Sequence, residues 1–197
     1  MKRYMKLLAA AGATLIAMNS CNDSQKTSGT ETAVLENIFS RTSVRKFTSE
    51  PVSGEQVETL LKAAMSAPSA MNRQPWRFVV ISDRQKLDSM AAKMPYARLD
   101  TAPMAIVVCG DLSEGENRFW EHDCSAATEN LLLAAHAMGL GAVWTAATDG
   151  ERAAIVREAL GLPSFIHPLC VVPVGHPDGD FTPKDKWDPS KIHYGKW

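Results

Sequence analysis

The chain has no excess of charge of either sign. Its 21 Lys and Arg residues nearly balance 22 Asp and Glu residues, which leaves a formal net charge of -1 over 197 residues. Non-specific binding to nucleic acid depends on an extended basic surface, and this composition does not provide one. We therefore expect no nucleic-acid partner, and any groups that bind an anion must be local.

Cysteine is also scarce. The four residues, Cys21, Cys109, Cys124 and Cys170, form no CxxC pair and have no His/Cys spacing typical of a zinc site, so we expect no metal. Cys109 and Cys170 lie in apolar runs and Cys124 lies in a helical pattern. These three thiols are interpreted as small buried hydrophobes.

The apolar run at the N-terminus, residues 7–18, is too short for a permanent membrane-spanning helix. A basic start and a closing cysteine flank it: Lys2, Arg3, Lys6, Ser20 and Cys21. This is the layout of an export signal, and we predict a signal peptide over residues 1–20. Because Cys21 follows the run directly, the segment resembles a bacterial lipoprotein signal whose cysteine is acylated.

That resemblance implies an exported lipoprotein, held at a membrane by lipid chains on Cys21 and facing the periplasm or the cell surface. Signal cleavage without acylation and an ordinary N-terminal helix are the alternatives. Residues 21–32 are rich in Ser, Thr, Asn, Asp and Gly without apolar periodicity, and we predict a flexible tether there. One compact domain over residues 33–197 follows.

Helix-like and strand-like patterns alternate through this domain. Ser53 and Gln56 form a capping box before an apolar helical face, and Gly139 is a natural stop for a long helix. Helices are expected at 33–40, 53–65, 83–94, 117–138 and 149–161, and strands at 76–81, 105–110, 142–146 and 169–175. The pattern indicates a sheet with helices packed on it and leaves the strand order open.

Three polar segments carry candidate binding groups. Arg41, Ser43 and Arg45 offer two guanidinium groups and a hydroxyl at a helix end, which suit a phosphate. Lys184 and Lys186 would lie on one side of an extended segment. The alternative for both segments is ordinary solvated charge.

The third segment is the loop APSAMNRQPWRF, residues 67–78. Its prolines fix the ends of a stretch with three hydrogen-bonding side chains, Ser69, Asn72 and Gln74. Such a loop can form the edge of a ligand site, or it can serve only as a connector that satisfies its own backbone.

In this order, the segments resemble the nitroreductase family of flavin enzymes. The similarity runs from about Ile38 to Trp197 through RTSVRKF, the loop above, APMAIVVCGD, DCSAATENLLLAAHAMGLGAVWTAA, VVPVGHP and IHYGKW. It implies an α+β fold with a central, mainly antiparallel sheet flanked by helices. It also implies an interlocked homodimer with one FMN at each of two sites on the interface, and a C-terminal tail that wraps the partner subunit.

The resemblance assigns roles by position. Arg41, Thr42, Ser43, Lys184 and Lys186 would hold the FMN phosphate, with Arg45 near the pyrimidine edge of the ring. Pro68, Ser69, Ala70 and Asn72 would reach the flavin of the other subunit, and Met71 would line the substrate face. Thr145, Ala146 and Ala147 would run along the ring. Some members of the family have Glu-Gly where this chain has Ala146 and Ala147, so a role for that carboxylate is not expected here.

The implied reaction is a ping-pong cycle in which NADH or NADPH reduces FMN and the flavin then reduces a nitro-aromatic, a quinone or a similar acceptor. No catalytic side chain is expected, because the cofactor carries the electrons and solvent can supply protons. A related reductive dehalogenase, which would carry a lid over the flavin, is one alternative. A membrane-anchored flavin- or ligand-binding protein without turnover is another.

Overall fold

The computed structural model describes residues 23–113, 117–148 and 150–197, with side chains from residue 29 onward. The predicted signal peptide, residues 1–20, and the predicted lipidation site Cys21 lie outside the described residues. Both stay predictions.

An antiparallel sheet forms the centre of the molecule. Its strands β1 (Trp76–Ile81), β2 (Met104–Asp111), β5 (Ile166–Gly175) and β3 (Gly141–Ala142) lie in that order, and the short β4 (Thr145–Ala146) also pairs with β5. Every strand pair is antiparallel. The α+β arrangement expected from the family resemblance is confirmed.

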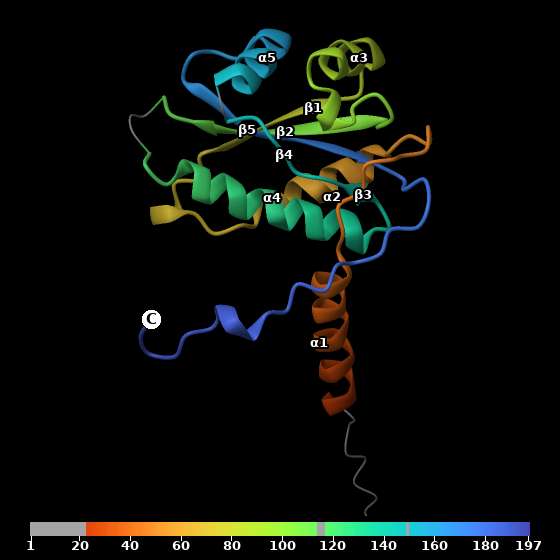
Figure 1. Ribbon diagram of the computed structural model, residues 1–197, viewed down its shortest axis with the longest axis vertical. Helices are drawn as coiled ribbons and strands as arrows, with labels where there is room; N and C mark the ends of the chain where they lie inside the picture. The colour runs from red at the N-terminus through yellow and green to blue at the C-terminus, as the bar shows by residue number, and fades with distance from the viewer. Residues whose placement is uncertain (1–22, 114–116, 149) are drawn as a thin grey trace, which may run out of the picture.

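Helices cover both faces of this sheet. Figure 1 shows α2 (Gly54–Met65) and α4 (Trp120–Ala137) on one face, with α3 (Arg84–Lys93) and α5 (Gly150–Leu160) on the other. The alternation of side chains along β2 explains the two layers. Met104, Ile106 and Val108 join the core beneath α2 and α4. Ala105, Val107 and Cys109 join the core beneath α3 and α5.

The ends of the helices follow from local hydrogen bonds. Ser53 Oγ accepts from the Gln56 N–H and Gln56 Oε1 accepts from the Ser53 N–H, so the predicted capping box is confirmed. Asp83 Oδ1 caps α3 by accepting from the Lys86 N–H. Gly139, with φ of 71°, follows the end of α4, in the left-handed conformation that favours glycine.

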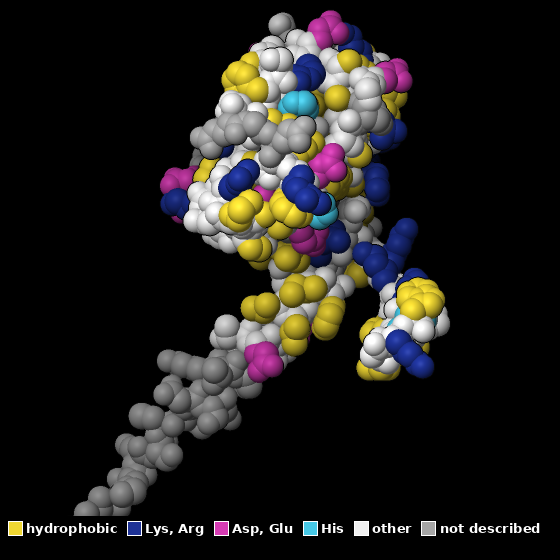
Figure 2. Space-filling view, turned by 90° about the vertical axis from the view of Figure 1, so that its left-hand side faces the viewer, with side chains coloured by type: hydrophobic (Ala, Val, Ile, Leu, Met, Phe, Trp, Pro, Cys, Tyr) yellow, Lys and Arg dark blue, Asp and Glu magenta, His cyan; other side chains and the backbone are white. Residues whose placement is uncertain are grey.

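The first helix, α1 (Asp23–Ser40), projects away from the body of the molecule (Figure 1). It corrects the predicted tether over residues 23–32, which are helical. This segment contains no proline, so a helix that forms in the apolar period after Ala33 can extend back through it. Figure 2 shows hydrophobic side chains along α1 near the body. Val34, Leu35, Ile38 and Phe39 are all exposed.

The C-terminal tail also leaves the body (Figure 1), and η3 (Pro189–Lys191) is a 3₁₀ turn within it. Two further 3₁₀ turns are η1 (Ala70–Asn72) and η2 (Pro95–Ala97). Trp187, Tyr194 and Trp197 are 74%, 89% and 97% exposed. Rings of this size usually bury area, so a single chain leaves the aromatic side chains of its tail without a surface to cover them.

The three cysteines within the domain are free and buried, as the sequence indicated. Burial raises the pKa of the Cys109 and Cys170 thiols to about 12 and raises that of Cys124 as well. Among the described residues, no group of His, Cys, Asp or Glu side chains could hold a metal ion. In the same part of the chain, no helix has the length and apolar character needed to cross a membrane.

A small apolar cluster, separate from the two main cores, joins three distant parts of the chain. It consists of Val44, Phe47 and Ala102, with Phe181 packed against them, and we call it the anchor cluster. Backbone hydrogen bonds extend the same contact: the Val44 N–H donates to Ala142 O (3.0 Å), and the Asp178 N–H donates to Lys46 O (3.0 Å). The segments on either side of Val44 and before Phe181 are therefore fixed in place.

Gly141 makes room for the anchor cluster. A Cβ at this position would lie 2.5 Å from Val44 Cγ1 and 2.7 Å from Val44 Cβ. These distances are too short for non-bonded carbon atoms, so Val44 or the backbone at position 141 would have to shift. The absence of a side chain at Gly141 is therefore a packing requirement.

Gly141→Ala should lower the free energy of unfolding by about 1–3 kcal/mol, because the added methyl group overpacks the contact with Val44. Gly54→Ala is the matched control, since a Cβ at Gly54 meets no atom within 4 Å. It should leave stability unchanged or slightly raised. Urea unfolding followed by tryptophan fluorescence measures both, and equal stability of the two variants would contradict this packing argument.

Candidate functional site

Four cations and two hydroxyls line one cavity of about 230 Å³ at the end of α1. Its lining residues are Arg41, Thr42, Ser43, Arg45, Lys184 and Lys186. Five of them, Arg41, Thr42, Ser43, Lys184 and Lys186, were predicted to hold the FMN phosphate, and Arg45 was predicted to lie near the pyrimidine edge of the ring. The structure brings all six together. We call this cavity the phosphate cradle.

Arg41 is held in the cradle by contacts with α1 and α4. Its backbone N–H donates to Asn37 O (3.2 Å), and its Nε pairs with Glu129 Oε1 (3.2 Å). Its side chain is only 18% exposed. Within the described residues neither Nη group has a partner, so the end of the guanidinium fork remains available to an anion.

Lys184 and Lys186 reach the cradle because Phe181 is fixed in the anchor cluster three residues earlier. In the described ranges, no carboxylate lies within ion-pair distance of Lys184, Lys186 or Arg45. Among the described residues, no acidic side chain lines the cavity either. Such a concentration of positive charge is suited to a dianion.

This convergence is an observation that supports a binding role for these segments over ordinary solvated charge. Solvated surface charges have no reason to gather, and like charges repel each other. Here apolar packing holds cations from opposite ends of the domain in one cavity beside two hydroxyls. A guanidinium fork, ammonium groups and hydroxyl donors together can bind a phosphate group.

The predicted loop after α2 has an unusual backbone. Met71, Asn72 and Gln74 have φ angles of 53°, 53° and 50°, which is the left-handed region that residues other than glycine seldom adopt. Side-chain hydrogen bonds support this shape: Ser69 Oγ accepts from the Gln74 N–H (3.0 Å). Gln74 Nε2 donates to Asn72 Oδ1 (2.9 Å). Strained backbone of this kind concentrates at functional sites.

The loop exposes the residues that were predicted to face a flavin. Pro68 and Asn72 are exposed, Ser69 and Ala70 are half-buried, and Met71 is 71% exposed. None of them lines the phosphate cradle of the same chain. Within one chain, the loop and the cradle are therefore separate surfaces.

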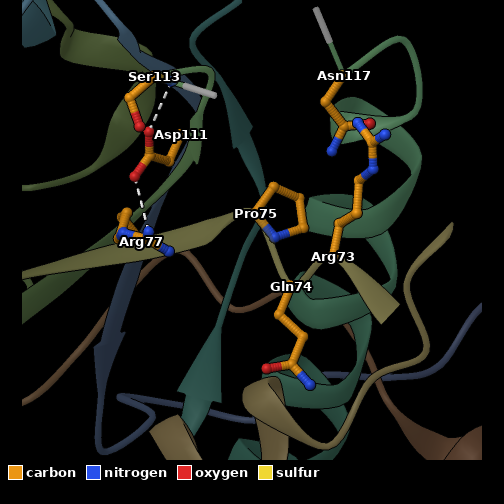
Figure 3. A pocket seen from close by; sticks show the side chains of 7 residues that line it. All are labelled: Arg73, Gln74, Pro75, Arg77, Asp111, Ser113 and Asn117. Carbon is orange, nitrogen blue, oxygen red and sulfur yellow. Dashed lines mark hydrogen bonds and ion pairs between the residues drawn. The ribbon is translucent and has the colours of Figure 1, made fainter. Parts of the chain in front are cut away.

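The far end of the loop is fixed beside a small polar pocket of about 80 Å³ (Figure 3). The Asp111 N–H donates to Pro75 O (2.8 Å), and Arg77 Nη2 pairs with Asp111 Oδ2 (2.7 Å). Hydrogen bonds from Ser113, aided by the Arg77 guanidinium, hold the pKa of Asp111 below its usual range. These contacts of Asp111 hold the end of the loop against β2.

The third predicted segment lies on β4 beside β5. Thr145 and Ala147 are buried and Ala146 is exposed. The Ala147 N–H already donates to Leu169 O (2.9 Å). Of the three predicted residues, Ala146 is therefore the one exposed at the surface.

Two contacts of this region were not predicted from the sequence. One is Glu129, which pairs with Arg41. The other is Asp123, whose Oδ1 accepts from the Ala70 N–H (2.9 Å). The sequence did contain a pattern that could have identified Asp123 as buried. Asp123, Ala127 and Leu131 recur every four residues, and all three lie on the buried face of α4.

Comparison with known proteins gives a consistent set of relatives. The model of the nitroreductase family matches residues 38–97 and 90–176. A predicted NADH dehydrogenase/NAD(P)H nitroreductase of Methanothermobacter thermautotrophicus is 42% identical, over 83% of this chain and 87% of its own.

Two solved structures are also similar. A predicted NADH dehydrogenase/NAD(P)H nitroreductase of Bacteroides thetaiotaomicron is 51% identical with a TM-score of 0.81, covering 84% of this chain and 98% of its own. An FMN-dependent nitroreductase of Clostridium difficile is 29% identical with a TM-score of 0.77, covering 83% of this chain and 99% of its own.

Lys186→Ala should remove most of the thermal stabilisation that inorganic phosphate gives beyond chloride at equal ionic strength. A ligand that binds the folded state raises the melting temperature, and a charge-assisted hydrogen bond contributes about 1.5–3 kcal/mol. Lys191→Ala removes a lysine from the same tail but outside the cradle, and it should respond to phosphate like the unaltered protein. An equal response of the two variants, measured by thermal unfolding, would argue against the cradle.

Proposed function

The chain belongs to the nitroreductase family, and on this premise we propose that it passes electrons from NAD(P)H through FMN to nitro-aromatic, quinone or similar acceptors. Its general activity is that of an FMN-dependent NAD(P)H oxidoreductase. The acceptor class and the order of steps are the finer part of the proposal. In this proposal the oxidised nicotinamide leaves before the acceptor enters.

The observation that supports this function most strongly is the phosphate cradle. FMN ends in a phosphate monoester, which carries up to two negative charges near neutral pH. The cradle offers the free fork of Arg41, the ammonium groups of Lys184 and Lys186, and the hydroxyls of Thr42 and Ser43. Its composition therefore fits the charged end of FMN.

The remaining assigned residues have roles that fit their exposure. Bound FMN supplies the chemistry, since it accepts a hydride and donates electrons. We assign Arg45 to the pyrimidine edge, where its positive charge favours electron uptake by the ring. Met71, exposed on its strained loop, provides a flexible apolar contact for planar acceptors. Protons come from solvent, and no side chain is assigned as an acid or base.

The active form in this proposal is a homodimer. In a single chain, none of the predicted loop residues lines the phosphate cradle. The same chain leaves apolar side chains of α1 and aromatic side chains of the tail exposed. Large exposed apolar surfaces mark interaction sites. A second copy that covers α1 and receives the tail would place Pro68, Ser69, Ala70 and Asn72 of one subunit against the FMN held by the cradle of the other.

The absorbance spectrum of the purified protein with FMN tests this function. Under anaerobic conditions NADPH or NADH should bleach the flavin bands, and a nitro-aromatic or a quinone should restore them. A protein that binds FMN but is reduced only by dithionite would be a flavin-binding protein without turnover with these donors. A protein that takes up no FMN would contradict the proposal.

A further inference from the structure

Asp123 is a buried carboxylate in the first turn of α4, directly beneath the strained loop. Its side chain is among the few polar ones in the core, with 5% of the residue exposed. Oδ1 accepts a hydrogen bond from the Ala70 N–H across 53 residues of sequence. The positive end of the α4 dipole favours a negative side chain at this place.

The second oxygen of this carboxylate is unusual. Asp123 Oδ2 is buried and has no hydrogen-bond partner among the described residues. A buried polar atom without a partner costs free energy, and an apolar residue of similar size would avoid that cost. An apolar residue could not accept the hydrogen bond that Oδ1 receives from the Ala70 N–H, so this bond is what the carboxylate adds at this position.

The loop needs such a contact at this position. Ser69 precedes η1 but gives it no side-chain cap, because its hydroxyl accepts from Gln74 instead. Asp123 therefore acts as the cap from outside the loop, one residue before Met71 and Asn72 enter the left-handed region. Positive φ at two successive non-glycine residues persists only where the surroundings enforce it.

We propose that Asp123 is a positioning residue that fixes the loop from Ser69 to Gln74 in its left-handed shape. The proposed function places this loop against the FMN that is bound in the partner's cradle. Asp123 would therefore affect the FMN of the partner and not the FMN in the cradle of its own chain. It touches neither cofactor nor substrate in this account. Its effect on the flavin rests on the proposed function, whereas its effect on the loop does not.

Two substitutions of Asp123 separate the hydrogen bond from the charge. Asp123→Ala removes the acceptor for the Ala70 N–H, and Asp123→Asn keeps an amide oxygen that can accept it. Glu121→Ala is the control, since Glu121 is an exposed carboxylate in the same turn of α4. It removes an equal charge without touching the loop.

The first measurement is independent of the cofactor. Trypsin can cut after Arg73, which lies exposed within the loop, and mass spectrometry compares that cut with cuts elsewhere in the full-length protein. In Asp123→Ala the relative rate after Arg73 should rise about tenfold, which is the effect of losing roughly one hydrogen bond. In Asp123→Asn and Glu121→Ala it should stay within about threefold of the unaltered protein.

The second measurement is flavin binding. Asp123→Ala should bind FMN roughly tenfold more weakly and shift the visible spectrum of the bound flavin, with Asp123→Asn restoring both. If Asp123→Ala matches the unaltered protein in cleavage, the positioning role is overturned. If cleavage changes as expected but even the Glu121→Ala control binds no FMN, the loop role stands and the proposed function fails.

Discussion

The site depends on one electrostatic constraint, which is that four cations are held in a single cavity whose wall, in the part of the chain that the structure describes, contains no acidic side chain. Left alone, these groups would repel each other and turn toward solvent. The anchor cluster opposes this, because Val44 and Phe181 fix the segments that carry the arginines and the lysines. Apolar packing thus stabilises a cluster of cations in which, among the described residues, Arg41 has an acidic partner, Glu129, and the other three do not, so that a bound anion would offset their charge.

The same chain also leaves large apolar side chains exposed. The exposed face of α1, the aromatic side chains of the tail and the outward-facing loop are separate features of one subunit. In the proposed homodimer they would belong to one interface, because the partner that covers α1 would also bring its loop to the cradle. Association and cofactor binding would then stabilise each other, because FMN bound between two chains favours the dimer.

Much of this fold could be predicted from the sequence, for reasons that particular residues make clear. Ser53 and Gln56 cap a helix through contacts within one turn, and the alternation along β2 needs only neighbouring residues. Only the family resemblance linked Arg41, Thr42 and Ser43 to Lys184 and Lys186, because their meeting depends on packing at Phe181. The left-handed shape of Met71 and Asn72 has no glycine to mark it. Its support, Asp123, lies 53 residues away from the loop. The helical state of residues 23–32 was missed because a polar composition was interpreted as a tether.

The most direct test of the composite site is FMN stoichiometry in a mixed dimer. One subunit would carry Arg41→Ala with Lys186→Ala, which disables the cradle, and the other would carry Ala70→Trp, which blocks the loop. Each altered homodimer should bind no FMN, whereas the mixed dimer should regain one FMN, because one of its two sites combines an intact cradle with an intact loop. A mixed dimer that binds no FMN would show that cradle and loop act within the same chain, and it would contradict the shared site.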